Sequence, residues 1–366
     1  MPPASRPFAL GMFSVPAVPG VPQPAALPRP FVGIVVDGRV TPLARLLAAA
    51  RQGGAASAAA PSAATPSAAV PLADRAADNL YSLLQDWPAR LDWLIEHVDR
   101  YFDEVTPQDR FEMDTLRAHA PIPEARQLIC TGANYRQHVI DLVFAQGGGA
   151  ATEGMTPEQR RADAVRRVDE RAANGIPYAF PKLSGSLCGP QDDLVVPRDA
   201  EQLDWELELG VVIGRPAWRI PRQSAMDVVA GYLIVNDITR RELVYRSDLR
   251  SLGSDWLRAK SGPGFMPSGP LFVPAPFVAD PHRLELHLEL NGETMQRETT
   301  ADMIFGIERQ IEYLSSYVRL LPGDIIATGS PAGNGMHYGR FLRPGDVMRA
   351  SITGLGTQVV RCIAEE

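Results

Sequence analysis

The sequence predicts an α+β fold that contains more strand than helix, and two observations support this prediction. From about residue 123 onward, short runs of Val, Ile and Leu alternate with breaks made of Gly, Pro and Asp. These runs are irregularly spaced and few helical segments separate them, which favours mixed topology over a doubly wound parallel sheet. Because the texture changes there, the chain is predicted to contain a small N-terminal α/β domain, residues 1–122, and a strand-rich domain, residues 123–366.

The N-terminal domain is predicted to open with an extended or poorly ordered segment, since residues 1–30 are rich in Pro and Ala. Residues 31–40 have the pattern of two short strands joined at Asp37-Gly38, a dipeptide typical of hairpin turns. A helix is expected over residues 42–51, followed by a flexible low-complexity loop over residues 52–69. Helical periodicity returns at residues 73–84 and 89–102.

The second domain is predicted to carry strands at residues 207–213, 228–235, 284–290, 324–328 and 347–352, and a helix at 301–315. A Gly-rich stretch at 146–150 precedes a strongly charged helix at 156–174, which starts with Thr156-Pro157. A hinge of this kind beside a polar helix indicates a mobile lid over residues 142–177. A solvated surface insertion explains the same pattern equally well.

The composition of the chain narrows the classes of molecule that it is expected to bind. The net charge of −7 argues against a nucleic-acid partner, because such a partner needs a basic face, but it is compatible with a small anionic substrate. The three cysteines, Cys130, Cys188 and Cys362, form no CxxC pair and fit a reducing compartment. We see no secretory signal and no apolar run of about eighteen residues, so a cytoplasmic protein without a membrane partner is expected.

An acidic segment at residues 203–209 provides the first candidate site. Apolar and acidic residues alternate there with the period of a β-strand. One face would be acidic and the other apolar: Asp204, Glu206 and Glu208 against Leu203, Trp205, Leu207 and Leu209. Carboxylates two residues apart repel unless a cation lies between them, and Mg²⁺ is the obvious candidate because it binds oxygen ligands. A solvated sheet face would give the same pattern.

A second carboxylate, Asp237, stands where the apolar strand at 228–235 ends in Asn236-Asp237 and turns. A rigid strand fixes such a residue while the turn opens a cleft, which suits a functional site. An ordinary turn or cap residue is the alternative.

A histidine and a carboxylate are spaced to meet on one helix. If the segment after Asn134 is helical, His138 and Asp141 lie at positions i and i+3 and can touch. A carboxylate that binds one imidazole nitrogen raises the basicity of the other, which is how a general base for water activation is built. A simple surface pair is the alternative interpretation.

Two lysines and one Gly-rich turn complete the candidates. Lys182 and Lys260 are the only lysines among 36 basic residues, and each precedes small, turn-forming residues, so a point charge could project into a cleft; solvated lysines are the alternative. At residues 323–333 a strand runs into a Gly-rich turn. Its amides and the Thr328 hydroxyl could bind a carboxylate oxygen, although an ordinary exit from a strand looks the same.

Taken in this order, these segments resemble the fumarylacetoacetate hydrolase family over residues 123–363. The family's NYxxH stretch is similar to residues 134–138, its D-x-E-x-E-L strand to 204–209, and its NDxTxRD turn to 236–242. Its lysine motif resembles Lys260-Ser261, and its ATG-x-P-x-G loop resembles residues 327–333.

The resemblance implies a mixed β-roll, a homodimer and one Mg²⁺ ion, or Mn²⁺ or Ca²⁺, held by Glu206, Glu208 and Asp237. It implies that His138 is the base and that Asp141 stands where relatives often carry a glutamate. Substrate contacts are implied for a further group of residues: Lys260, Tyr135, Lys182, Arg241, Thr328 and Gly329.

The activity implied by the resemblance is hydrolysis of a C–C bond in a 1,3-diketone or acylpyruvate-type 2-oxo acid through a metal-stabilised enolate, as in the catabolism of aromatic compounds. The same enolate chemistry would serve a decarboxylase, hydratase or isomerase, and a non-catalytic metal- or ligand-binding protein is the alternative from another class. Three departures from the family leave the substrate open. Asp141 is shorter than glutamate, Thr131 and Gly132 offer no additional metal-binding carboxylate, and Val244 stands where many relatives have a glutamine.

Overall fold

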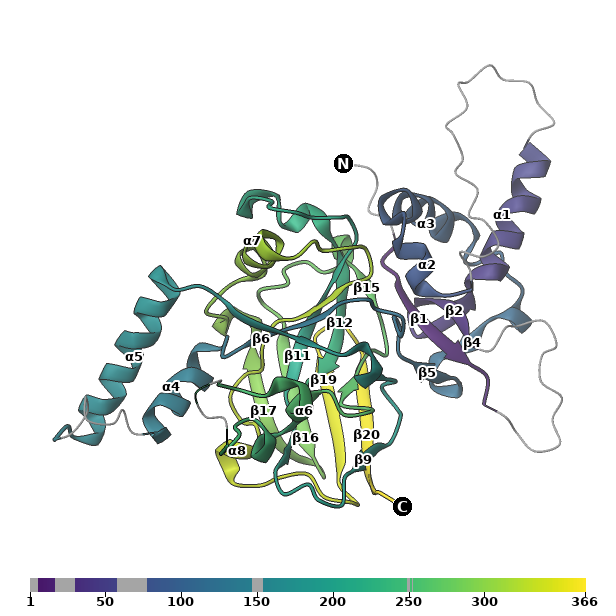
Figure 1. Ribbon diagram of the computed structural model, residues 1–366. Coiled ribbons are helices and arrows are strands. Elements are labelled where there is room, and N and C mark those ends of the chain that lie inside the picture. Colours follow the sequence, from purple (N-terminus) through teal and green to yellow (C-terminus); the bar gives the residue numbers. More distant parts are fainter. Residues whose placement is uncertain (1–5, 17–29, 58–77, 147–153, 249–250, 252) are drawn as a thin grey trace.

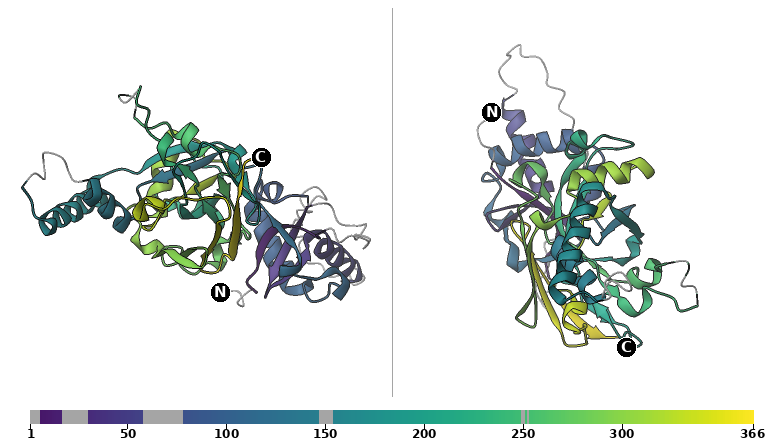
Figure 2. Two further views of the ribbon diagram at one scale, coloured as in Figure 1. Left: turned by 90° about the horizontal axis from the view of Figure 1, so that it is seen from below. Right: turned by 90° about the vertical axis from the view of Figure 1, so that its left-hand side faces the viewer.

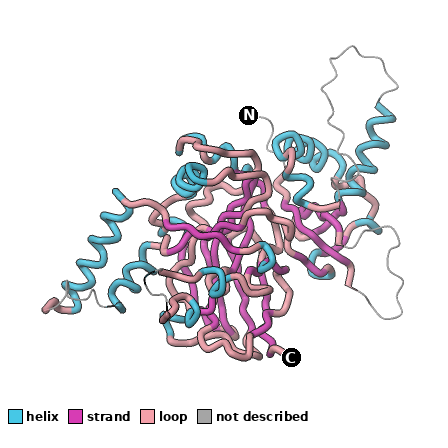
Figure 3. The backbone as a smooth tube through the Cα atoms, in the orientation of Figure 1, coloured by secondary structure: helices cyan, strands magenta, loops and turns pink. Residues whose placement is uncertain are grey.

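The computed structural model describes residues 6–16, 30–57, 78–146, 154–248, 251 and 253–366. It confirms the α+β, β-rich fold class: sheets form the body of the molecule and helices lie around them (Figures 1 and 3). Within these residues, no helix is both long enough and apolar enough to span a lipid bilayer.

The described residues before 123 build an antiparallel sheet with the strand order β4-β3-β2-β1-β5. The hairpin predicted at Asp37-Gly38 is confirmed, because Val36 pairs with Arg39 across it and both turn residues have positive φ angles, as such turns require. The strands are β1 (Ala9–Ser14), β2 (Phe31–Val36), β3 (Arg39–Pro42), β4 (Phe111–Glu112) and β5 (Arg117–His119).

One expectation for this region is made more specific and one needs correction. Residues 9–14, inside the segment expected to be extended or poorly ordered, are extended and form β1 between β2 and β5. The predicted loop 52–69 is helical at its start, because α1 (Leu43–Ser57) ends only at Ser57; Ala-rich sequence has the highest helix propensity. Residues 58–69 lie outside the described part of the chain.

The other two predicted N-terminal helices are present with shifted starts. They are α2 (Leu80–Leu84) and α3 (Trp87–Tyr101). The Asn79 side chain accepts a hydrogen bond from the Ser82 amide over 2.8 Å, so it caps α2 and explains why that helix starts at residue 80. Residues 73–77 of the predicted helix lie outside the described residues.

Two further sheets form the body. In the described residues the central sheet has the order β15-β12-β11-β18-β6-β7, with β18 and β6 parallel and its other pairs antiparallel. The second sheet has the order β17-β16-β19-β20-β9. Their strands are β6 (Leu128–Gly132), β7 (Tyr178–Lys182), β9 (Leu194–Val196), β11 (Leu207–Ile213), β12 (Val229–Asn236), β15 (Val273–Pro274), β16 (Glu285–Leu290), β17 (Glu293–Thr299), β18 (Ile325–Ala327), β19 (Val347–Ile352) and β20 (Thr357–Ala364).

The central sheet is buried on both faces, which explains its long apolar runs. On β11, Leu209 and Val211 point into a core shared with the second sheet, and Val212 points into a core shared with the N-terminal sheet. Leu10 of β1 exchanges backbone hydrogen bonds with Phe272, just before β15, so the two regions are joined by backbone as well as by apolar contacts.

The acidic segment is two strands rather than the single strand predicted. Residues 203–204 form β10, which pairs with β13 (Thr239–Arg240), and β11 starts only at Leu207. On either side of the break, Asp204 binds the Gly335 amide and Glu206 binds Lys260, while Arg241 binds both carboxylates. One more pair of short strands completes the sheets: β8 (Leu187–Cys188) and β14 (Met266–Pro267).

The helices beyond residue 123 are α4 (Arg136–Gln146), α5 (Pro157–Asn174), α6 (Trp256–Lys260), α7 (Ile307–Tyr317) and α8 (Gly335–Tyr338). Helix α7 starts six residues later than predicted, because Asn134 binds the amides of Ile304 and Phe305 and holds that segment extended. Thr156 caps α5 as predicted. Helices α4 and α5 pack against each other at the end of the molecule opposite the N-terminal elements (Figures 1 and 2). The mobility of the lid over 142–177 stays a prediction.

Candidate active site and metal centre

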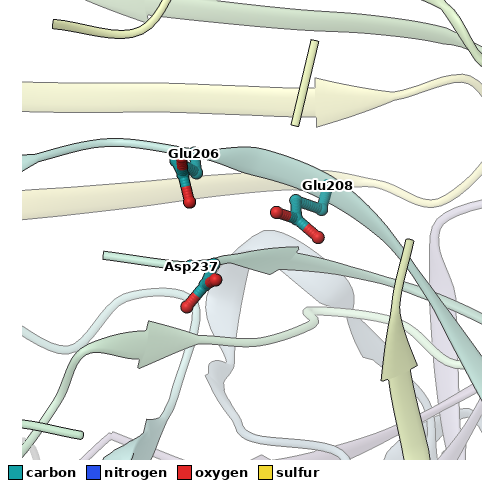
Figure 4. Close-up of side chains that lie close together, drawn as sticks. All are labelled: Glu206, Glu208 and Asp237. Atoms are coloured by element: carbon teal, nitrogen blue, oxygen red, sulfur yellow. The ribbon is translucent and has the colours of Figure 1, made fainter. Parts of the chain in front are cut away.

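Three carboxylates meet at one end of the central sheet. Glu206 precedes β11, Glu208 lies on β11, and Asp237 follows the last residue of β12; the Asp237 amide donates to the Glu206 carbonyl over 2.9 Å. Each offers an oxygen within 4.8 Å of the others, and the three side chains point toward one another (Figure 4). All three are at most 7% exposed, so the alternative of a solvated sheet face is wrong.

Buried cations surround this group, defined here as the acidic triad of Glu206, Glu208 and Asp237. Lys260 Nζ donates to one oxygen of Glu206 and to one of Asp237, each over 2.5 Å. Arg241 donates to Glu206 over 2.5 Å. Burial alone would raise the pKa of Glu206, but Arg241 and Lys260 lower it well below its ordinary range. Glu206 is therefore held as an anion, and Asp237 forms ion pairs with Lys260 and Lys182.

Glu208 is placed differently from the other two. Its carboxylate accepts a hydrogen bond from the Gly329 amide over 2.7 Å, and no ion pair to it is found among the described residues. Burial raises its pKa well above the ordinary value, and the like charges of Asp237 and Glu206 raise it further. A buried carboxylate that lacks a counter-ion favours a nearby cation. The donor set fits a hard divalent ion, because all three ligands are carboxylate oxygens.

Asp204 does not join the triad. It accepts from the Gly335 amide over 2.5 Å and from Arg241 Nε over 2.7 Å, so it anchors the start of α8 and orients Arg241. Of the three carboxylates predicted to share a strand face, two therefore belong to the triad and one supports a cation beside it.

Lys182 does not lie where it could contact a substrate, which corrects that expectation. Its side chain is fully buried, and Nζ donates to three protein oxygens: Asp237 Oδ1 over 2.6 Å, the Phe265 carbonyl over 2.6 Å and the Ile238 carbonyl over 3.3 Å. An ammonium group has three donors, so none is left over. Lys182 is an internal counter-ion that fixes one oxygen of Asp237.

Replacing Lys182 with methionine should lower the free energy of unfolding by about 3–5 kcal/mol, because breaking a buried ion pair leaves charge uncompensated. Chemical denaturation of both proteins measures the difference. Arg222→Met is the matched control: its ion pair with Glu312 joins side chains that are 54% and 37% exposed, and exposed pairs contribute no more than about 1 kcal/mol. Equal losses in the two variants would contradict the assignment.

His138 lies on α4 and lines the same pocket as the acidic triad. Burial lowers its pKa from 6.5 to about 4; the charge of Arg241 lowers it too, while Glu206 acts in the opposite direction. The imidazole is therefore neutral at pH 7 and can accept a proton.

The predicted pairing of His138 with Asp141 is not present. Asp141 Oδ1 instead accepts from Gln137 Nε2, one turn earlier, over 2.7 Å and lies 3.7 Å from Arg161 of α5. No hydrogen bond or ion pair between His138 and Asp141 is found in the described residues. The i, i+3 spacing was compatible with contact, but two other partners occupy the carboxylate.

The pocket has a volume of about 650 Å³, and its described lining residues all belong to residues 131–336. Of the predicted site residues, it is lined by the acidic triad, His138, Arg241 and Lys260, and also by Val244. Tyr135, Asp141, Lys182, Thr328 and Gly329 are not in this lining.

Thr328 and Gly329 support the triad from outside the pocket rather than offering free donors to it. The Thr328 hydroxyl donates to the Leu209 carbonyl over 2.9 Å. Gly329 has a φ of 102°, and a Cβ there would lie 2.8 Å from Asn134 Cβ, so the turn needs glycine to bring its amide to Glu208. The Gly-rich turn was predicted to bind a carboxylate, and the carboxylate that Gly329 binds is the protein's own.

Aromatic residues of the pocket were missed by the sequence prediction. Phe180 and Trp256 stack with ring centroids 4.6 Å apart, and Trp256 Nε1 donates to the Tyr178 hydroxyl over 2.6 Å. These three residues, defined here as the aromatic wall, all line the pocket. Their proximity to Lys182 and Lys260 in the sequence was the available signal.

The chain is similar in sequence to known proteins. The family model described as Fumarylacetoacetate (FAA) hydrolase C-terminal matches residues 127–362. A curated relative, 2,4-didehydro-3-deoxy-L-rhamnonate hydrolase of Sphingomonas sp. (strain SKA58), is 40% identical over 185 residues, which are 50% of this chain and 63% of that protein. The chain covers 63–65% of the length of the curated relatives that it matches at this identity.

Two solved structures share the fold. The structure of 2-hydroxyhepta-2,4-diene-1,7-dioate isomerase from Mycobacterium marinum is 29% identical, with a TM-score of 0.53 over 71% of this chain and 82% of that one. The structure of maleylpyruvate hydrolase from Sphingobium sp. SYK-6, in complex with manganese (II) ion and pyruvate, covers 98% of this chain and 100% of its own. It is 21% identical with a TM-score of 0.65, and the likeness is one of fold.

Proposed function

Because this chain belongs to the fumarylacetoacetate hydrolase family, we propose that it is a divalent-metal-dependent enzyme that processes a 2-oxo acid. The finer proposal is hydrolysis of a C–C bond in a 1,3-diketone or acylpyruvate-type 2-oxo acid. The observation that carries it is the buried acidic triad, whose oxygens lie within 4.8 Å of one another beside a pocket that also holds Lys260 and His138.

Glu206, Glu208 and Asp237 would hold the ion, for which we propose Mg²⁺, with Mn²⁺ or Ca²⁺ as alternatives. When bound, the ion supplies Lewis-acid stabilisation of the negative charge that develops on the substrate. The 2-hydroxyhepta-2,4-diene-1,7-dioate isomerase and 2,4-didehydro-3-deoxy-L-rhamnonate hydrolase named above support a substrate of the 2-oxo acid type.

The charges around the site favour an anionic substrate. Four buried carboxylates, the acidic triad and Asp204, face three buried or half-buried cations, namely Lys182, Lys260 and Arg241. With all of them ionised, the cluster carries one net negative charge, and a divalent ion would reverse its sign. The site would then attract one carboxylate of the substrate.

Lys260 and His138 have separate tasks in this proposal. The Lys260 ammonium, fixed between Glu206 and Asp237, places a second positive charge where the enolate forms. Its pKa is raised by Asp237 and Glu206 against the opposing effect of burial, so it stays charged. His138 is neutral at pH 7 and takes the proton of the water that attacks the carbonyl carbon.

The proposal is tested by assaying the purified protein with acylpyruvates and oxaloacetate, with Mg²⁺ and with EDTA. We expect turnover that EDTA removes and Mg²⁺ restores. No turnover of any of these 2-oxo acids with Mg²⁺, Mn²⁺ or Ca²⁺ would instead support a non-catalytic metal- or ligand-binding protein.

Isomerisation on the same site is the second candidate, and a specific observation favours it. His138 has no carboxylate partner in the described residues, and moving a proton within a substrate needs only a neutral base, whereas water activation gains from an oriented one. Product analysis separates the two reactions, because hydrolysis releases two molecules and isomerisation releases one. Decarboxylation would release CO₂, and hydration would add the mass of water.

We also propose that the protein is a cytoplasmic homodimer. The homodimer is expected from the family resemblance, and the location from the unpaired cysteines and the lack of a recognisable secretory signal. Light scattering on the eluting protein tests the oligomeric state, with a mass of two chains as the expected result.

A further inference from the structure

The aromatic wall lies directly beside the acidic triad. Lys260 Nζ, which binds Glu206 and Asp237, is 5.3 Å from the ring centroid of Phe180 and 5.6 Å from that of Trp256. Any group attached to a 2-oxo acid at the triad and extending toward α6 would therefore meet these two ring faces.

The stacked rings of Phe180 and Trp256 present no unpaired polar group. The Phe180 and Trp256 rings stack at an angle of 15°, and the indole N–H of Trp256 is bonded to Tyr178. A ring held in this way offers an apolar face without a penalty for a lost hydrogen bond.

The wall stands at the edge of the core and reaches two cavities. Phe180 is 7% exposed and belongs to the core cluster against which Trp256 packs. Both rings also line a second cavity of about 420 Å³, which shares Gly253 and Ser254 with the first.

In the described lining of the pocket, the cationic side chains already have carboxylate partners. The Lys and Arg side chains there are Lys260 and Arg241, and both are bound to protein carboxylates. Arg246, which lines the second cavity, is paired with Asp248. These pairings favour a ligand with one carboxylate at the metal site over a dicarboxylate.

We propose that the substrate is a 2-oxo acid with a single carboxylate and a planar, apolar substituent, such as an aryl group, which packs on the aromatic wall. This inference rests on the proposed function and specifies its substrate class. This substrate class differs from the 1,7-dioate for which the M. marinum isomerase is named, because that compound has two carboxylates. Phe180 and Trp256 are then specificity-determining residues.

Binding of three simple probes tests the proposal without requiring turnover. Titration calorimetry of the full chain with Mg²⁺ would compare pyruvate, phenylpyruvate and 2-oxoglutarate. We expect phenylpyruvate to bind at least about tenfold more tightly than pyruvate, because burying a phenyl ring is favourable. The second carboxylate of 2-oxoglutarate should give no gain over pyruvate.

Substitutions in the aromatic wall test whether it causes the expected preference for phenylpyruvate over pyruvate. Trp256→Leu should bring the affinity for phenylpyruvate to within about threefold of that for pyruvate, measured on the same variant. Trp218→Leu is the matched control, because Trp218 is 44% exposed and does not line either cavity. Phe180→Leu provides a second test if the melting temperature shows that Trp256→Leu does not fold.

The outcomes are distinguishable. Tighter binding of 2-oxoglutarate than of phenylpyruvate, or an unchanged preference in both wall variants, overturns this inference and leaves the proposed function standing. No Mg²⁺-dependent binding of pyruvate at all overturns the proposed function, and the inference with it.

Discussion

Replacing Glu208 with glutamine should abolish metal-dependent turnover and at the same time stabilise the metal-free protein. Glu208 is the triad member without an ion pair, and its pKa is raised by burial and by the neighbouring carboxylates. A raised carboxyl pKa means that the folded state binds the proton more tightly than the unfolded state does, so ionisation of Glu208 opposes folding. That opposition is absent below the ordinary pKa of 4.5 and grows as the pH rises above it. Glutamine removes it.

Thermal unfolding with EDTA and with Mg²⁺ measures both effects. Without metal at pH 8, the melting temperature of Glu208→Gln should exceed that of the wild type, and the difference should shrink as the pH falls toward 4. With Mg²⁺, the wild type should gain stability and the variant should not, since loss of a ligand should weaken binding by at least about 100-fold.

Glu293→Gln, an exposed change of the same type on β17, should alter neither result. A Glu208→Gln protein that Mg²⁺ still stabilises would show that this carboxylate does not hold the ion.

Replacing His138 with alanine should lower kcat by about 10²–10⁴-fold if it is the general base. Its pKa of about 4 predicts the pH profile as well. A base works when deprotonated, so the activity that depends on His138 should be lost as the pH falls through about 4, and no loss should appear near the ordinary value of 6.5. Steady-state rates between pH 4 and 8 test both statements.

Two variants serve as controls for this experiment. His287→Ala changes a histidine of β16 that contacts Thr294 outside the pocket, and it should leave kcat unchanged. Asp141→Asn should change kcat by less than about tenfold, because its carboxylate is bound by Gln137 rather than by His138. A loss of kcat in Asp141→Asn as large as that in His138→Ala would support the originally predicted pairing of these two residues.

The metal centre was the part of the site most accessible from sequence. Glu206 just before β11 and Glu208 on it are two residues apart, and Asp237 follows the last residue of β12, so the local pattern placed all three on or beside strands. Pairing of β11 with β12 brings them together, with Leu207 opposite Asn236. Local rules therefore sufficed for residues whose position follows from strand geometry.

The residues that were misjudged depend on contacts between distant segments. Lys182 was predicted to contact the substrate because its neighbours in the sequence give no sign of an internal partner. Its three acceptors come from residues 237, 238 and 265. Asp141 was expected to bind His138, but its carboxylate binds Gln137 and lies near Arg161 of another helix instead. The aromatic wall joins Phe180 and Trp256, which lie 76 positions apart and meet only after folding.

The fold shows the same limit. The runs at 207–213 and 347–352 were predicted with their observed bounds. The first is buried along its whole length and the second alternates between buried and more exposed residues, and both patterns are typical of strands. The break at residues 205–206 was missed, since alternation alone favours one continuous strand. Leu203 and Asp204 pair with β13, which separates them from β11. β10 and β13 start 36 positions apart in the sequence, so the local pattern could not reveal this pairing.

The first described strand, β1, bonds through Leu10 to the backbone beside the central sheet, and Leu10 packs in a core that includes residues of that sheet. The described lining of the pocket comes entirely from residues 131–336. Substitutions in the described residues before 123 can therefore change how the N-terminal sheet packs without altering the described lining of the pocket. Laboratory evolution aimed at new ligands should find its useful changes among residues 131–336.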